Sequence, residues 1–263
     1  MLTERSARVA AAVKLHRHVG RRRTGRFLAE GPNLVEAAAA RGLVRDVFVT
    51  EAAEQRYADL LAAQRGPVHL VTERAAKALS DTVTPTGLVA VCEMPPTGLA
   101  DVLAGSPRLV AVAVEIGEPG NAGTVIRIAD AMGADGVILG GHSVDPYNGK
   151  CLRASTGSIF SIPVVAAPDA AAALAGVREA GLQVLATTVD GETRLDEAAG
   201  VLGRPTAWLF GPESQGLPTE LAAAADHRMR IPMAGGAESL NVASAAAICL
   251  YQSAQALGVF RRP

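Results

Sequence analysis

Three short loops carry the side chains of this chain that are best suited to chemistry. The first, GEPGNAGTVIR, contains Asn121 and Arg127; the second, GPESQGL, contains Glu213; the third, GGAESLN, contains Ser239 and Asn241. Together they offer amide, carboxylate, hydroxyl, guanidinium and backbone groups. They hold neither a metal-ligand cluster nor a cysteine next to an activating base. The set therefore suits binding and positioning of polar ligands, without a metal.

The first loop has a structural interpretation beside the functional one. Asn121 can simply cap a helix, and the glycine spacing fits neither a dinucleotide fingerprint nor a Walker loop. Arg127 follows six residues later among the apolar neighbours Val125, Ile126 and Ile128. Such an arginine either extends its head to solvent or binds an anion. We favour the anion, because a helix N-terminus beside it also attracts negative charge.

The second and third loops likewise allow structural interpretations. The second is not a hydrolase nucleophile elbow, because Pro212 occupies the position two before Ser214 where that turn needs glycine. The five histidines suggest no Ser-His-Asp set. Glu213 can be a surface turn carboxylate, and Glu238 or Ser239 can be a helix cap. The functional interpretation rests on three special loops occurring together.

The second half of the chain alternates apolar runs with helical patterns. The run RLVAVAVEI is typical of a strand buried on both faces. Strands are predicted at 108–116, 136–140, 161–166, 182–189, 206–211 and 227–233, and helices at 124–133, 168–180, 217–225 and about 241–257. Alternation of this kind predicts an α/β fold with a mostly parallel sheet and helices on both faces. Ligands bind at the carboxyl ends of such strands, where the three loops lie.

The first half predicts a smaller α/β unit. Strands are expected at 26–30, 44–50, 66–72 and 86–94, with helices at 33–42 and 73–80 and helical spacing over 3–18. The sequence PPTG at 95–98 is the best linker signal in the chain. The predicted division is a basic extension at 1–25, a smaller α/β domain at 26–95, a linker at 96–106 and a larger α/β domain at 107–263, which contains the three loops.

Charge is distributed unevenly. The 263-residue chain has a formal net charge of -1, yet its first 30 residues hold eight basic and two acidic side chains, or +6, which leaves -7 for the rest. A basic segment suggests nucleic acid, although a solvated helix face is an equally simple interpretation. Aromatic residues make up only 3%. No run of apolar residues predicts a membrane span or secretory signal, and three scattered cysteines favour a reducing cytoplasm.

Taken together, the three loops resemble the signature motifs of the SpoU/TrmH family of RNA ribose 2'-O-methyltransferases, within the SPOUT superfamily. The matching segments are Asn121 through Arg127 to Gly133, then LFGPESQGL, then IPMAGGAESLNVASAAA. Residues 150–158 resemble a pattern between the first two motifs, and 26–95 resembles the family's ribosomal-protein-like substrate-binding domain. One position departs: Pro212 stands where family members often carry asparagine, so any contact of that amide is lost.

The resemblance implies a parallel-sheet SPOUT domain with a trefoil knot, and a homodimer with the active site at the subunit interface. S-adenosylmethionine would lie in the knot, held by Gly211, Ile231, Met233 and Leu240. The implied catalytic positions are Arg127, Asn121, Glu213, Ser239 and Asn241. RNA would be bound by Arg17, Arg21, Arg22, Arg23, Arg26, Lys150 and Arg153.

The implied reaction is methyl transfer from S-adenosylmethionine to a ribose 2'-hydroxyl of RNA, with 23S-type ribosomal RNA as the expected substrate. Arg127 would bind an RNA phosphate and the incipient alkoxide, since a guanidinium is a poor base. Two alternatives remain: a non-catalytic RNA-binding or ribosome-assembly protein, and a transfer RNA ribose methyltransferase. No metal or membrane partner is expected, and the expected location is the cytoplasm.

Overall fold

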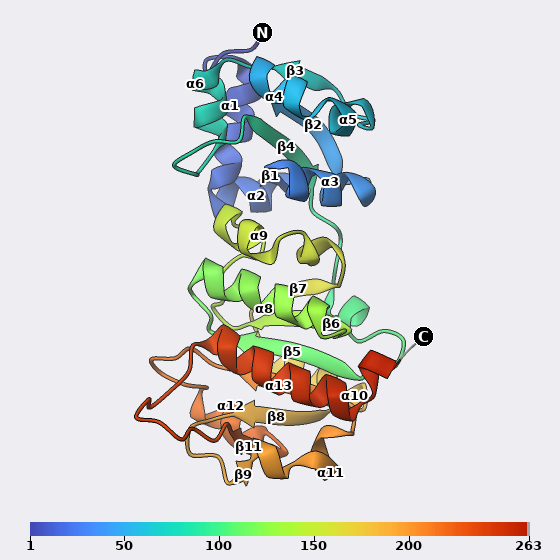
Figure 1. Cartoon of the computed structure of the whole chain (residues 1–263), viewed down its shortest axis with the longest axis vertical. Helices are drawn as coiled ribbons and strands as arrows, with labels where there is room; N and C mark the ends of the chain where they lie inside the picture. The colour runs from blue at the N-terminus through green and yellow to red at the C-terminus, as the bar shows by residue number, and fades with distance from the viewer. Residues whose placement is uncertain (262–263) are drawn as a thin grey trace. The chain divides into compact units, whose positions relative to one another are not determined.

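The computed structural model describes residues 1–261, which pack as two compact units (Figure 1). The first unit comprises Met1–Pro96 together with Tyr147–Phe160. The second comprises Thr97–Pro146 and Ser161–Pro263. The chain therefore leaves the second unit and returns to it once, between β6 and β7.

The second unit is built on a seven-stranded sheet in the order β7-β6-β5-β10-β8-β11-β9. Every strand pair in it is parallel, which confirms the predicted parallel sheet. All residues of β5, β6 and β10 are buried, as their continuous apolar sequences require. The strands are β5 (Leu109–Val114), β6 (Gly136–Gly140), β7 (Val164–Ala167), β8 (Gln183–Thr187), β9 (Thr193–Arg194), β10 (Thr206–Phe210) and β11 (His227–Arg230).

Helices cover both faces of this sheet. On one face α8 and α13 pack side by side across the central strands (Figure 1), where Trp208 Nε1 of β10 donates to Ser253 Oγ of α13 at 2.9 Å. On the other face α10 packs its Leu174 and Val177 against Val112 and neighbouring strand residues. The helices are α7 (Leu99–Val102), α8 (Pro119–Ala131), α10 (Ala170–Glu179), α11 (Ala199–Leu202), α12 (Thr219–Ala224) and α13 (Val242–Ala256), with a 3-10 turn at Leu195–Glu197.

Two helix caps differ from the sequence interpretation. Helix α8 begins at Pro119 and is capped by Glu118, whose Oε1 accepts from Gly120 N at 3.4 Å. Proline suits the first position of a helix, because a backbone N–H at that position has no hydrogen-bond partner within the helix. Asn121 therefore lies inside the first turn and is free of capping duty. Helix α13 is capped by Asn241, so the expectation of a cap at Glu238 or Ser239 is wrong.

The first unit holds a four-stranded sheet in the order β1-β4-β2-β3. Only β2 and β3 run parallel; the other pairs are antiparallel. Helices α1 and α6 pack on one face of this sheet around Leu28, Phe48 and Val89. Helix α3 contacts β1, β2 and β4, and α9 contacts β1. The elements are α1 (Ala7–Val13), a 3-10 turn (Lys14–His16), α2 (His18–Thr24), β1 (Arg26–Glu30), α3 (Pro32–Ala40), β2 (Val44–Val49), α4 (Glu51–Arg56), α5 (Ala58–Ala62), β3 (Val68–Leu70), α6 (Glu73–Leu79) and β4 (Leu88–Glu93).

The segment 147–160 supplies part of the core of the first unit. It contains α9 (Gly149–Ser155) and a 3-10 turn at Ser158–Phe160. The ring of the fully buried Phe27 in β1 lies 4.9 Å from that of Tyr147 and 5.8 Å from that of Phe160. These residues fall within the range predicted for the catalytic domain, yet they pack with the N-terminal sheet.

None of the helices in the described part of the chain is both long and apolar enough to cross a membrane.

Candidate active site and cofactor cavity

The three polar loops meet at the carboxyl ends of the central strands of the second unit. The first loop connects β5 to α8, the second follows β10, and the third connects β11 to α13. Because β5, β10 and β8 are adjacent and parallel, their carboxyl ends lie at one edge of the sheet. Residues more than one hundred positions apart in sequence thereby become neighbours.

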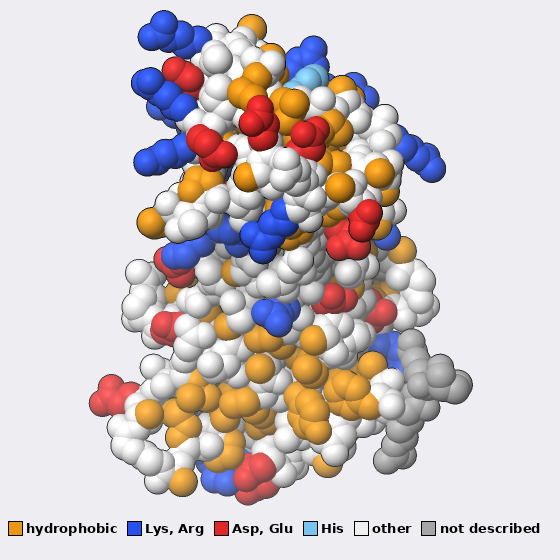
Figure 2. Space-filling model, turned by 45° about the horizontal axis from the view of Figure 1, so that its top comes forward, with side chains coloured by type: hydrophobic (Ala, Val, Ile, Leu, Met, Phe, Trp, Pro, Cys, Tyr) orange, Lys and Arg blue, Asp and Glu red, His pale blue; other side chains and the backbone are white. Residues whose placement is uncertain are grey.

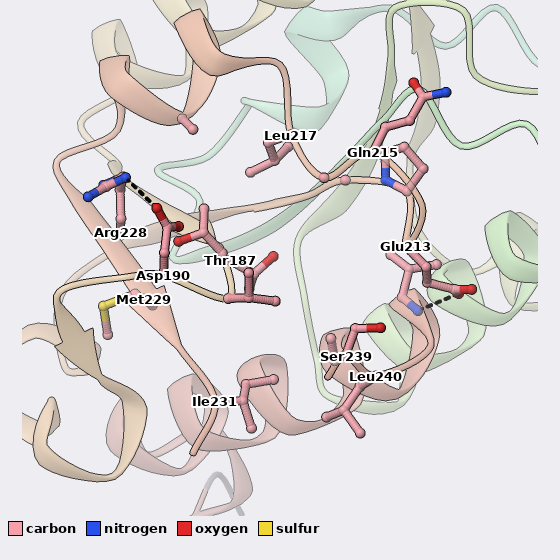
Figure 3. Close-up of a pocket in the computed structure, with 18 of the residues that line it drawn as sticks. Thr187, Asp190, Glu213, Gln215, Leu217, Arg228, Met229, Ile231, Ser239 and Leu240 are labelled. Atoms are coloured by element: carbon pink, nitrogen blue, oxygen red, sulfur yellow. Dashed lines mark hydrogen bonds and ion pairs between the residues drawn. The ribbon is translucent and has the colours of Figure 1, made fainter. Parts of the chain in front are cut away.

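Asn121, Glu213 and Asn241 form one hydrogen-bonded cluster, with one residue from each loop. Asn241 Nδ2 donates to Glu213 Oε1 at 2.7 Å and to Asn121 Oδ1 at 3.1 Å. Asn121 Nδ2 donates to Glu213 Oε1 at 3.4 Å. The backbone N–H of Val242 donates to the same carboxylate oxygen at 2.8 Å (Figure 3). The cluster fixes the three loops relative to one another.

The loop after β10 folds back tightly on Gly211. A Cβ atom at this position would lie 2.5 Å from Leu217 N and 2.6 Å from the carbonyl carbon of Gly216, so only glycine fits. Gly216 closes the turn with φ +68°, and its N–H donates to the carbonyl of Pro212 at 2.8 Å. Pro212 therefore takes part in the turn through its carbonyl oxygen.

A cavity of about 580 Å³ lies between the second and third loops. Figure 3 shows Leu217, Ile231 and Leu240 on its apolar sides. All four residues predicted to hold the cofactor, and Ser239 as well, line this cavity; they are Gly211, Ile231, Met233 and Leu240. A volume of this size with apolar walls and a few polar groups is typical of small-molecule and cofactor sites. The residues fit a nucleoside-containing cofactor held by backbone groups and aliphatic side chains.

A second, more open cavity of about 610 Å³ borders the first. It is lined by Asn121 and by residues of the loop that connects β5 to α8. Both cavities share Pro212, Glu213, Ser214, Gln215 and Val242. The shared wall includes Glu213, the carboxylate of the hydrogen-bonded cluster, so a ligand in the more open cavity would lie next to a ligand in the first one.

Arg127 is not brought into either cavity. It lies on the exposed side of α8, and it lines neither of the two cavities described here. Within the described part of the chain its side chain has no hydrogen bond and no ion pair. A guanidinium without an internal partner is available to an external anion or to another protein chain.

The predicted RNA contacts on α2 divide into exposed and buried residues. Arg17, Arg22 and Arg23 are exposed. Arg21 is only 3% exposed, and its Nη1 donates to the carbonyl oxygens of Leu15 and His16, at 2.9 Å each. The expectation that Arg21 contacts RNA is therefore corrected: it secures the turn between α1 and α2. Charge counting along the sequence could not separate it from its neighbours.

The remaining basic candidates also differ in availability. Arg26 lies 3.9 Å from Glu93 Oε1 and is partly exposed. Arg153 forms an ion pair with Asp81 and lies 3.9 Å from Glu30 Oε2. Its charge is thus used to hold 147–160 in the first unit. Lys150 is exposed at the start of α9.

The sequence interpretation missed a fourth polar strand end. Thr187 ends β8, Thr188 and Asp190 follow it, and all three line the first cavity. Arg228 of β11 lines it as well and pairs with Asp190 at 3.4 Å (Figure 3). The available signal was positional: β8 is a neighbour of β10, so its carboxyl end lies at the same edge as the three loops.

No thiol or metal centre accompanies these groups. Burial raises the pKa of the Cys92 and Cys249 thiols, so neither is an activated nucleophile. All three cysteines are buried and none is in a disulfide. The residues that the structure describes contain no group of three or more His, Cys, Asp or Glu side chains able to hold a metal ion.

Comparison with protein families gives two matches. Residues 108–251 match the family model described as the SpoU rRNA Methylase family. Residues 6–90 match a model described as the MRM3-like substrate binding domain. Together these matches span both compact units.

Individual relatives agree with these matches. The chain is 36% identical over 240 residues to a 23S rRNA (guanosine(2553)-2'-O)-methyltransferase, RlmP, of Bacillus subtilis, covering 90% of this chain and 92% of that protein. Among solved structures, the SpoU methyltransferase AviRb from Streptomyces viridochromogenes in complex with AdoMet is 32% identical, with a TM-score of 0.84 over 95% of this chain and 98% of that one. An AdoMet-bound rRNA methyltransferase from Sinorhizobium meliloti is also 32% identical, with a TM-score of 0.83 over 96% and 95% of the two chains.

Proposed function

The chain belongs to the SpoU rRNA methylase family, and from this membership we infer that it is an RNA ribose 2'-O-methyltransferase that uses S-adenosylmethionine. Its substrate is ribosomal RNA, in line with the reactions named for its relatives. The observation that carries this conclusion is the hydrogen-bonded cluster of Asn121, Glu213 and Asn241, whose Glu213 lines both the cofactor-sized cavity and the more open cavity.

We propose that the first cavity, between the second and third loops, holds the cofactor and that the more open cavity admits the target ribose. S-adenosylmethionine supplies an activated methyl group on a sulfonium centre. The protein must place the 2'-oxygen in line with that methyl group and stabilise the charge that develops as its proton leaves. Asn121, Glu213 and Asn241 keep the loops in place, while Ser239 lines the cofactor cavity and is exposed toward an incoming ligand.

We further propose that the protein works as a homodimer whose active site lies at the subunit interface. Helix α13 exposes an apolar stripe that contains Ile248 and Tyr251, which are 37% and 47% exposed, and the ring of Tyr251 lies 5.5 Å from that of Phe260. Figure 2 shows hydrophobic side chains gathered over this part of the second unit. A second copy covering the stripe would remove this apolar surface from water.

A dimer also gives Arg127 a role that one chain alone does not provide. The residue is exposed on α8, which packs beside α13. In the proposed dimer Arg127 of one chain reaches the site of its partner, where it binds an RNA phosphate and the incipient alkoxide. Arginine is suited to this because its fork forms two parallel hydrogen bonds to phosphate oxygens.

The trefoil knot is part of the same proposal. After β11 the chain returns to the centre of the sheet, where α13 packs on β5, β10 and α8. This return brings the loops after β10 and β11 together around the cofactor cavity. We likewise keep the division into a basic extension at 1–25, an RNA-binding domain at 26–95, a linker at 96–106 and a methyltransferase domain at 107–263 as a proposal, with 147–160 packing in the first unit.

RNA capture is assigned to the first unit. Arg17, Arg22 and Arg23 present exposed charge on α2, and residues 6–90 match a substrate-binding domain. Aromatic side chains for base stacking are few, at 3% of the chain. Binding should therefore depend on phosphate contacts and on the folded shape of the RNA. A ribosomal RNA substrate and three cysteines without disulfides fit action in the cytoplasm.

The function is tested by mapping ribose methylation. Total RNA from a strain lacking the gene is incubated with the purified protein and methyl-labelled S-adenosylmethionine, separated into ribosomal and transfer RNA, digested and analysed by mass spectrometry. One 2'-O-methyl nucleotide absent from the mutant RNA should be restored. Label on transfer RNA alone would favour the transfer RNA alternative, and cofactor binding with no transfer to any RNA would favour a non-catalytic assembly protein.

A further inference from the structure

Glu115 has a backbone conformation that few residues with a side chain adopt. It directly follows β5, and its φ of +56° lies in the left-handed region, where glycine is favoured because it has no Cβ atom. Among the described residues only Ser106 and Thr156 share this feature, and neither lines one of the two cavities. Glu115 lines the more open cavity. A strained residue at a cavity wall indicates a function for its side chain.

The backbone around Glu115 is fixed by the loop after β6. The N–H of Glu115 donates to the carbonyl of Gly140 at 3.1 Å. The N–H of Ile116 donates to Ser143 Oγ at 3.0 Å, and its carbonyl accepts from Val144 N at 2.9 Å. These hydrogen bonds hold the left-handed conformation in place and determine the direction in which the side chain leaves the chain.

The carboxyl group of Glu115 also has a defined position. Its Oε1 accepts from His142 N at 3.2 Å and lies 3.4 Å from His142 Nδ1. A Cβ atom on Gly141 would overlap this carboxyl group, so the position depends on glycine there. Within the described part of the chain, Oε2 of Glu115 makes no hydrogen bond. The contact between the loops therefore uses one oxygen and leaves the other for a ligand.

The wall of the more open cavity is acidic. Glu115, Glu118 and Glu213 line it, and none of its described lining residues is lysine or arginine. Such a wall repels RNA phosphates, so the part of the RNA that enters must be a nucleoside that presents hydrogen-bond donors. Glu118 caps α8, and Glu213 accepts from Asn241. Glu115 is therefore the carboxylate best placed to accept hydrogen bonds from a nucleoside.

We propose that Glu115 selects the target nucleotide by its base and that this base is guanine. Guanine presents two adjacent donors, N1–H and the N2 amino group, on its Watson–Crick edge, and they match the two oxygens of a carboxylate. Oε1 can take part because an ionised carboxylate has about four lone-pair sites. Unpaired RNA bases expose this edge to proteins.

The other three bases fit the carboxylate less well. Uracil presents one N–H between two carbonyl oxygens, and adenine and cytosine each place an acceptor nitrogen beside their amino group. Each of them would bring at least one acceptor against Glu115. This inference rests on the proposed function, because it takes the more open cavity as the site of the target ribose.

The first experiment uses the wild-type chain. Once the methylated nucleotide has been mapped, transcripts that contain it are prepared with guanosine or inosine at that position. Inosine differs from guanosine only by lacking the N2 amino group. We expect kcat/KM to be lower by about tenfold or more for inosine, as for the loss of one hydrogen bond to a charged acceptor. A target other than guanosine, or equal rates for the two transcripts, would overturn the proposal.

Glu115→Gln then separates base selection from the contact between the loops. Glutamine keeps an oxygen that accepts from His142 N, but it turns an amino group toward the two donors of guanine. The preference for guanosine over inosine should shrink to about twofold or less, measured as single-turnover rates. The unfolding temperature and the Kd for S-adenosylmethionine should stay at the wild-type values. The control is Glu179→Gln, at an exposed glutamate of α10, which should retain the preference.

A purely structural carboxylate predicts a different pattern. Glu115→Gln would then leave the preference for guanosine intact and change both rates by the same factor, and this result would refute the assignment. If the wild-type chain transfers no methyl group to any RNA, the proposed function fails first. The two failures are therefore distinguishable.

Discussion

The side-chain amide of Asn241 donates to Glu213 Oε1 at 2.7 Å, while its side-chain oxygen accepts from Ala243 N at 3.0 Å. One residue thus caps α13 and fastens that helix to the loop after β10. These two duties can be separated by mutation, because capping needs only the oxygen and the contact with Glu213 needs the amide.

Asn241→Asp should retain the N-cap of α13 and lose the hydrogen bond to Glu213. Aspartate is a good N-cap, but it places a carboxylate against Glu213. We expect turnover to fall by about tenfold or more, since misplaced active-site loops are costly. Asn241→Ala should lose turnover as well and, in addition, about 1 kcal/mol of stability. Steady-state kinetics measures the turnover, and thermal unfolding measures the stability. Wild-type turnover in Asn241→Asp would show that the amide contact is dispensable.

Arg127→Lys should impair turnover with little effect on folding. The side chain is exposed and has no partner in the described chain, so the free energy of unfolding should change by less than about 0.5 kcal/mol. Lysine keeps the charge but loses the planar fork, and we expect turnover to fall by about tenfold or more. Arg204→Lys, at another exposed arginine of the same unit, serves as the control and should retain turnover.

Mixing two inactive variants should restore activity if Arg127 acts on the partner's site. A heterodimer of Arg127→Ala and Glu213→Ala chains contains one complete site and one doubly defective site. Random pairing at equal amounts would then recover about a quarter of the wild-type rate per chain, given a closed two-fold dimer. Each variant alone should be inactive. No recovery after confirmed subunit exchange would place Arg127 in the site of its own chain.

RNA binding should depend on salt through the exposed arginines only. Arg22→Ala and Arg23→Ala should each lower the slope of log affinity against log salt by about 0.7 to 0.9. Arg21→Ala should instead lower the unfolding temperature, because Arg21 holds two backbone carbonyls in the interior. Filter binding at several salt concentrations tests the first part. An unchanged slope for both exposed residues would move RNA binding away from α2.

Asp226 should contribute stability that acid removes. Burial tends to raise the pKa of this carboxyl, but hydrogen bonds from Val184 N at 2.7 Å and from Arg178 Nη1 at 2.9 Å outweigh it and hold the pKa below its ordinary value. Because the folded pKa is the lower one, the contribution is complete above about pH 4 and disappears as the pH falls through the folded value.

Asp226→Asn should therefore lower the unfolding temperature at neutral pH, and the gap to the wild-type chain should narrow below about pH 4. Thermal unfolding between acidic and neutral pH measures this gap. Asp59→Asn, at an exposed carboxylate on α5, should show no such gap. A gap that stays constant with pH would mean that the hydrogen bonds matter but the charge does not.

Hydrophobic patterning predicted much of the catalytic unit because its signals are local. The run over β5 is apolar at every position, and the structure buries all of it. The three loops were found because glycines, amides and carboxylates follow such runs. What patterning missed depends on contacts between distant residues. The position of Asn121 within α8 follows from the start of that helix at Glu118 and Pro119. Asn241 caps α13 and also contacts Glu213 and Asn121, which are far away in the sequence.

Which of the charged side chains is buried could not be predicted from the sequence, for a related reason. Arg21, Arg22 and Arg23 are adjacent and chemically identical, and only the direction of each side chain from α2 separates them. The fourth polar strand end was missed because Thr187 and Thr188 continue the β-branched pattern of β8 and contain no glycine. A residue that looks like part of a strand gives no sign that it lies beside a cavity.

Because 147–160 belongs to the first unit, the polypeptide passes between the two units more than once. The chain crosses between them at 96–97, 146–147 and 160–161. After a protease cut within 97–106, the N-terminal piece would be held by its packing contacts with 147–160. Deleting the first 96 residues would leave Tyr147 and Phe160 without Phe27, their buried ring partner. Exchange of RNA-binding domains between related enzymes would have to transfer 147–160 as well, so this domain is a replaceable module only when both of its pieces move together.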